Sequence, residues 1–260
     1  MGAGAILPGY EAMADLKTAL AHHTAGRLDL AKAGYEAVLA RESGQPDALH
    51  MLGVICVGEG DTARGLALIR EALAHRPDFP MAWNNLGLVL MGAGKVEDAA
   101  EAFERSAGLS PEDGEIRLNL AMARHKQGRL EAAIEAYRAA AALRPNSAKA
   151  RLLLGHALKD AGRRDDAVES YRAATAVQPD LGDAHWYLAQ VLRDLDRPAD
   201  AAAACRRAVE LDPANALARQ VLSHLLLRLD RHHEGLAELA RSEGVIEFAA
   251  GPDAPVRIVQ

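Results

Sequence analysis

Hydrophobic and polar residues follow a helical period within one unit that recurs along most of the chain. The clearest copy of this unit covers residues 80–113. In it, Trp83, Leu86 and Leu90 have the spacing of one face of an α-helix. This pattern predicts a first helix over residues 81–93.

A glycine separates this helix from a second one. Gly94 can adopt a positive φ without a Cβ clash, so it is expected to end the first helix. The second helix is predicted to begin near Val96, to bury Ala99 and Phe103, and to end before Pro111, which has no backbone N–H to donate. The unit is therefore a helix–turn–helix hairpin.

The hairpin repeats at a fixed interval of 34 residues, and this regular spacing is the evidence for repetition. The prolines are Pro77, Pro111, Pro145, Pro179 and Pro213. The turn residues are Gly26, Gly60, Gly94, Gly128 and Gly162, followed by Asp196 and Asp230. The small residues of the second helix are Ala31, Gly65, Ala99, Ala133, Ala167, Ala201 and Gly235. Together these positions predict about seven hairpins.

A 34-residue hairpin that carries W-x₂-LG, a small residue, an aromatic residue and a proline resembles the tetratricopeptide repeat. The residues that carry this resemblance are Trp83, Leu86, Gly87, Ala99, Phe103 and Pro111. The resemblance implies an all-α fold, a right-handed superhelical solenoid of antiparallel hairpins whose first helices line a concave groove. The predicted repeats are 12–45, 46–79, 80–113, 114–147, 148–181, 182–215 and 216–249, between an N-terminal extension, 1–11, and a tail, 250–260.

Composition narrows the classes of function. The net charge of −6 leaves no broad basic field for a phosphate backbone, which argues against nucleic acid as a partner. No signal peptide and no apolar run long enough for a membrane span are present in the sequence. Cys56 and Cys205 occupy core positions more than four repeats apart, so they cannot pair within one chain. Unpaired buried thiols indicate a reducing compartment, and the expected location is the cytoplasm.

The sequence contains no recognisable catalytic, metal-binding or cofactor-binding motif. The adjacent pairs His22-His23 and His232-His233 point about 100° apart on a helix, so neither is a ready pair of metal ligands. We therefore predict a chain that is not itself an enzyme, with no cofactor and no metal, and we look for its function on the concave face.

The predicted concave face is rich in methionine. Apart from the initiator, the methionines are Met13, Met51, Met81, Met91 and Met122, and each lies in a predicted first helix at a groove position. Methionine is flexible and polarisable, and it recurs on surfaces that accept varied apolar partners. The predicted peptide-binding residues are Asn84, Asn85, Asn119, Met51, Met81, Met91, Met122, Leu88, Leu118, Leu152 and Trp186.

Asn85 and Asn119 occupy equivalent positions in neighbouring repeats, where their amides could bond a ligand backbone. This pair resembles the asparagine ladder of the repeats attached to O-linked N-acetylglucosamine transferases, although Met51 and Leu153 interrupt the series on either side. The other interpretation is that the amides bond neighbouring groups of the protein itself.

The tail departs from the helical pattern. Residues 245–248 and 256–259 are typical of short strands around a Gly-Pro loop. The first helix of the last repeat is rich in leucine, including Leu225 and Leu226, and no polar closing helix follows it. Either a further domain begins here, or the tail or a second chain covers the last repeat.

Three functions are consistent with these features. The preferred hypothesis is a protein–protein interaction module that binds a peptide or helix of a partner in its groove. In the second, the chain is the substrate-recruiting N-terminal region of a larger transferase-type enzyme, because stretches such as PDALHMLG resemble repeats that precede such domains. In the third, the chain is a scaffold that forms homo-oligomers through the uncapped repeat at 216–249.

Overall fold

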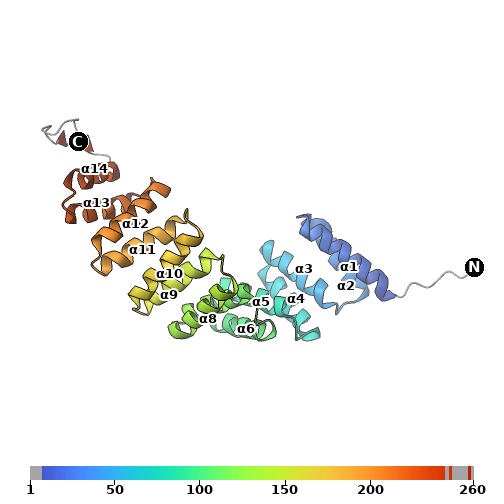
Figure 1. The fold of residues 1–260 in the computed structure, drawn as a ribbon. Coiled ribbons are helices and arrows are strands. Elements are labelled where there is room, and N and C mark those ends of the chain that lie inside the picture. The colour runs from blue at the N-terminus through green and yellow to red at the C-terminus, as the bar shows by residue number, and fades with distance from the viewer. Residues whose placement is uncertain (1–7, 244–245, 248–256, 259–260) are drawn as a thin grey trace, which may run out of the picture. The chain divides into compact units, whose positions relative to one another are not determined.

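The computed structural model describes residues 8–243, 246–247 and 257–258. The chain forms two compact units, residues 1–128 and 129–260 (Figure 1). The helices of the first unit are α1 (Pro8–Thr24), α2 (Leu28–Arg41), α3 (Pro46–Gly58), α4 (Thr62–His75), α5 (Pro80–Gly92), α6 (Val96–Leu109) and α7 (Gly114–Lys126). Those of the second are α8 (Leu130–Leu143), α9 (Ala148–Asp160), α10 (Arg164–Val177), α11 (Gly182–Asp194), α12 (Pro198–Leu211), α13 (Ala216–Arg228) and α14 (His232–Glu243).

The helices pack as hairpins in chain order. Within the first unit, α1 packs on α2, α3 on α4 and α5 on α6, and each second helix also packs on the first helix of the next hairpin. The second unit follows the same rule from α9 to α14. This arrangement confirms the seven-repeat prediction, and the helix predicted over 81–93 is observed as α5. The first helix begins at Pro8, earlier than the repeat spacing indicates.

The turn between the two helices of a hairpin adopts the predicted left-handed conformation. Gly94 has φ 74°, and its successor Lys95 donates its backbone N–H to the carbonyl of Leu90 at 2.9 Å, which closes the end of α5. In the last two repeats aspartate occupies this position, and Asp196 and Asp230 both have φ 57°. A side chain with a Cβ is strained in this region of φ.

Replacing Asp230 with glycine is therefore expected to raise the free energy of unfolding by about 0.5–1 kcal/mol, because glycine adopts positive φ without the steric cost. The reciprocal change, Gly94→Asp, should lower the free energy of unfolding by a similar amount. Urea denaturation of both variants measures the effect. A loss of stability in Asp230→Gly would show that the aspartate contributes more than its backbone conformation costs.

A further polar contact recurs at the start of the first helices. In several repeats, the side chain six residues after the proline that recurs every 34 residues donates to the carbonyl oxygen of that proline. These bonds are Trp83 to Pro77 at 2.7 Å, Arg117 to Pro111 at 3.1 Å and Arg219 to Pro213 at 3.0 Å. His185 makes the equivalent contact with Pro179 at 3.0 Å. These bonds tie the loop between hairpins to the helix that follows it.

The core lies between the two helices of each hairpin and the next hairpin. Its largest buried side chains include one aromatic position of the second helices, occupied by Tyr35, Phe103, Tyr137 and Tyr171. Small residues face these rings from the first helices. A Cβ added to Gly87 would lie 2.6 Å from Cε1 of Phe103, so this glycine permits the close approach of α5 and α6.

The two strands predicted in the tail are present. β1 (Ile246–Glu247) pairs in antiparallel register with β2 (Arg257–Ile258), with Ile246 opposite Ile258. The rest of the two predicted strand segments lies outside the described residues. Within the described part of the chain, no helix combines the length and apolar character needed to cross a bilayer.

Candidate binding surface on the first helices

The first helices of the first unit bring several of the predicted binding residues onto one surface. α3 contacts α5, and α5 contacts α7, so their equivalent positions lie next to each other. We call the surface formed by Leu20, Met51, Val54, Leu88 and Met122 the first-helix face. Met51, Val54 and Met122 are half-buried, whereas Leu20 and Leu88 are exposed. The surface is therefore both attached to the core and open to a ligand.

The other predicted residues divide by exposure. Met81 is exposed, and Asn84, Asn85 and Met91 are half-buried. Leu118 is only 1% exposed, so it belongs to the core and offers no surface to a ligand. Sequence spacing placed Leu118 on the correct helix but could not show how deeply it is buried.

Hollows lie beside the side chains of the first-helix face, and two of them are next to α3. A partly enclosed cavity of about 230 Å³ lies between α1 and α3 and is lined by Leu16, Lys17, Leu20, Tyr35, Asp47 and Met51. A more open hollow of about 480 Å³ lies between α3 and α5 and is lined by Val57, Thr62, Leu88, Val89, Gly92 and Ala93. Apolar side chains dominate both linings, which suits apolar groups of a ligand.

The predicted asparagines form hydrogen bonds between successive first helices. Nδ2 of Asn119 donates to Oδ1 of Asn84 at 2.9 Å, and Asn119 is buried. Nδ2 of Asn85 lies 2.8 Å from Nε2 of His50. Because the amide nitrogen can only donate, Nε2 of His50 accepts and the proton of the neutral ring lies on Nδ1. The amides thus link α3 to α5 and α5 to α7.

His50 lies at the centre of a buried cluster at the junction of the second and third repeats. Its ring packs edge-on against Phe79 with 4.8 Å between centroids, and the guanidinium of Arg76 lies 3.6 Å from the Phe79 centroid. Arg76 also donates to both carboxylate oxygens of Asp47, at 2.7 and 3.1 Å. Burial lowers the pKa of His50 to about 4, and Arg76 adds to this effect while Asp47 opposes it. The histidine is therefore neutral at pH 7.

In the second unit, Leu152 and Trp186 are half-buried on α9 and α11. Nearby, Nδ1 of His156 lies 2.9 Å from the hydroxyl of Tyr171, and the rings of His156 and Tyr187 meet edge-on at 4.4 Å. Nζ of Lys159 lies 5.6 Å from the Tyr187 centroid. This face is more aromatic and more basic than the first-helix face of the first unit.

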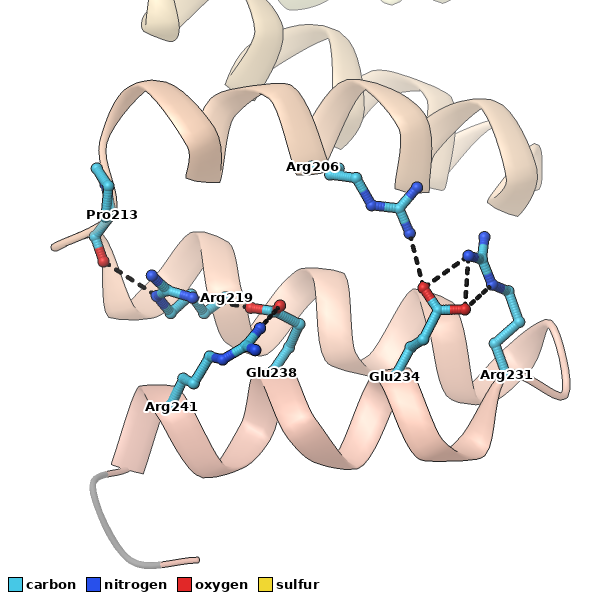
Figure 2. A network of polar contacts seen from close by, with 7 residues as sticks. All are labelled: Arg206, Pro213, Arg219, Arg231, Glu234, Glu238 and Arg241. Carbon is cyan, nitrogen blue, oxygen red and sulfur yellow. Dashed lines mark hydrogen bonds and ion pairs between the residues drawn. The ribbon is translucent and has the colours of Figure 1, made fainter. Parts of the chain in front are cut away.

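Ion pairs link the two helices of the last repeat to each other and to α12. Figure 2 shows Glu234 of α14 between Arg206 and Arg231, at 3.2 and 2.6 Å. Glu238 likewise pairs with Arg219 at 2.9 Å and with Arg241 at 2.5 Å.

Leu225 and Leu226 are buried, so these two leucines do not form the exposed apolar end that the sequence indicated. Leu217 on the same helix is 59% exposed, so self-assembly through the repeat at 216–249 stays a prediction.

Sequence reasoning missed Leu16 and Leu20 of α1, because the first repeat carries polar residues at several positions where the others are apolar. Leu20 is 34 residues before Val54 and 68 before Leu88, so it occupies the same position of the repeat as both. The repeat spacing would therefore have identified it. The bond between Asn85 and His50 was also missed. This bond joins residues 35 apart, at two different positions of the repeat, and a comparison of positions 34 residues apart does not bring them together.

Comparison with known families agrees with this architecture. A sequence model described as tetratricopeptide repeat matches residues 16–78, 57–113, 84–148 and 152–216. No match was found among the curated proteins.

Many solved structures resemble the fold. A structure from a study of Pseudomonas aeruginosa PilF is 17% identical, with a TM-score of 0.68, over 84% of this chain and 97% of that one. YrrB, described as having an unusual peptide-binding site, is 18% identical with a TM-score of 0.63, over 76% and 97%. MamA from Desulfovibrio magneticus RS-1 is 21% identical with a TM-score of 0.57, over 64% and 93%. Likenesses at this level of identity show the fold alone.

Proposed function

Because this chain belongs to the tetratricopeptide repeat family, we propose that it is a protein-interaction module that binds an apolar segment of a partner protein on the first-helix face of its first unit. We propose no catalytic activity, cofactor or nucleic-acid partner for this chain. A cytoplasmic location is part of the same proposal and is supported by the buried, unpaired thiols of Cys56 and Cys205.

The observation that carries the proposal is the exposure of large apolar side chains beside apolar hollows. Leu88 is 46% exposed and lines the hollow between α3 and α5. Met81, on the same helix, is also exposed. A leucine and a methionine exposed together on one helix, next to a concave surface, favour contact with another molecule.

The asparagines have a different part in this proposal from the one that the sequence indicated. Asn119 uses its amide nitrogen for Asn84, and Asn85 uses its amide nitrogen for His50. We propose that these bonds hold the first helices in register and that apolar contacts provide most of the affinity for the ligand. The self-assembly alternative would need a surface other than Leu225 and Leu226, because both are buried.

Site-specific photo-cross-linking tests the proposal. A photoreactive amino acid at position 88 is expected to cross-link a partner protein in the cells that make this chain. The matched control is position 109, because Leu109 is 43% exposed, close to the 46% of Leu88, but lies on the second helix of the same hairpin. Cross-linking from position 109 and none from position 88 would contradict binding on the first-helix face.

A further inference from the structure

We infer, on the basis of the proposed function, that the bound segment is an amphipathic α-helix with two apolar anchors and an acidic residue near the first. The first anchor would enter the cavity between α1 and α3, and the second would enter the hollow between α3 and α5. The acidic residue would lie beside Lys17. Three observations support this choice of ligand: the use of the amides inside the protein, the spacing of the hollows, and the charge at the first cavity.

The amide nitrogens of the surface each make one hydrogen bond inside the protein, which leaves them fewer N–H groups for a ligand. An extended peptide leaves its own backbone N–H and C=O groups to be satisfied by the surface that binds it, and burial of such groups without partners is costly. Here the amide nitrogens of Asn85 and Asn119 already donate to His50 and Asn84. A helix satisfies its backbone internally and needs only apolar contacts, so this surface suits a helix better than an extended strand.

The spacing of the two hollows fits positions on one helix face. Neighbouring packed helices lie about 8–10 Å apart. Along α3, the lining of the second hollow at Val57 lies six residues beyond Met51 of the first, or about 9 Å at the rise of an α-helix. The combined separation of about 13 Å corresponds to between two and three helical turns, so two anchors on one face can reach both hollows.

The first cavity has the size and charge for a single anchor with an acidic neighbour. An apolar cavity of about 150 Å³ can hold benzene, so the cavity of about 230 Å³ can hold a leucine or phenylalanine side chain. Asp47 at its edge is paired with Arg76. Lys17 forms no ion pair within the described residues, and its charge is therefore available to a carboxylate one turn from the anchor.

Selection from two peptide libraries tests this inference with the full 260-residue chain. Both libraries would display 18-residue segments that match in composition apart from the changes that fix their conformation. In one, the segments are stapled as helices; in the other, regularly placed prolines prevent helix formation. Dissociation constants of the selected peptides would then be measured by fluorescence anisotropy against the wild type, Leu20→Asp, Leu88→Asp, Lys17→Glu and Leu30→Asp.

We expect binders from the helical library with apolar residues two to three turns apart. Leu20→Asp and Leu88→Asp should each weaken them at least tenfold. Leu30→Asp is the matched control, because Leu30 is 53% exposed and Leu20 46%, but Leu30 lies on α2 outside both hollows; it should change affinity less than twofold. Lys17→Glu should weaken binding severalfold, and replacing the peptide's acidic residue with lysine should restore it.

The contrary outcomes separate the two proposals. Binders that depend on Leu20 and Leu88 but come only from the proline-containing library would overturn the helical ligand and leave the proposed function standing. If neither library yields binders that depend on these leucines, while circular dichroism shows that the variants are folded, both the helical ligand and the binding surface are wrong.

Discussion

Replacing Phe103 with alanine is expected to lower the free energy of unfolding by about 3–5 kcal/mol, the usual cost of removing a fully buried aromatic ring. Phe103 is almost completely buried and packs in a cluster with Leu86, Leu90 and Ile116 from the helices around it. The side chain therefore joins its own hairpin to the next one. Urea denaturation followed by circular dichroism measures the loss, which should appear as a lower midpoint.

Two glycine substitutions on α5 test the packing around Phe103 in a second way. Gly87→Ala should lower the free energy of unfolding by about 1–3 kcal/mol, because the new methyl group meets the Phe103 ring. Gly92→Ala on the same helix meets nothing within 4 Å and should be neutral or slightly stabilising. Adding Phe103→Leu to Gly87→Ala should cost less than the sum of the single changes. Equal effects of Gly87→Ala and Gly92→Ala would contradict the described packing.

Acidification below pH 6.5 is the second large effect expected. The folded chain holds His50 with a pKa of about 4, below the ordinary value of 6.5, so the unfolded chain binds the proton first as the pH falls. The contribution of neutral His50 to the free energy of unfolding is therefore fully present above pH 6.5. It is lost as the pH falls from 6.5 to about 4. The shift corresponds to a total loss of about 3 kcal/mol.

A variant that lacks only His50 isolates this contribution from the carboxylates that titrate in the same range. His50→Gln keeps an acceptor for Nδ2 of Asn85 but cannot take up a proton. Its free energy of unfolding should fall less steeply than that of the wild type between pH 6.5 and 4. His224→Gln, a change on an exposed position of α13, should leave the wild-type slope unchanged. The same slope in all three proteins would show that His50 does not titrate abnormally.

The helices and their hairpins were predictable because the repeat supplies many copies of each signal. One glycine in a turn is weak evidence, but Gly26, Gly60, Gly94, Gly128 and Gly162 at one spacing predict a positive φ at each, which the structure shows. The aspartates Asp196 and Asp230 adopt the same conformation despite their side chains. Spacing thus predicts backbone conformation even where the residue type changes.

Contacts between successive repeats could not be predicted in this way. The 34-residue spacing assigns Asn85 and Asn119 to one position, but their partners, His50 and Asn84, come from a neighbouring position one helix away. Burial also depends on the adjoining helices, which is why Leu118 is in the core while Leu88 is exposed. The sequence therefore predicted which helices form the proposed binding surface better than it predicted the burial and contacts of individual residues on it.

NMR of a sample labelled at the methyl groups of methionine and leucine tests most directly whether a partner binds on the first-helix face. The chain carries natural probes there in Met51 and Met122, and Met81 is exposed on α5. On titration with the partner recovered by cross-linking, the methyl signals of Met51 and Met81 should shift, while the methyl signals of Leu30 and Leu109 on the second helices should not. Unchanged methionine signals at saturation, with shifts confined to Leu30 or Leu109, would contradict the account.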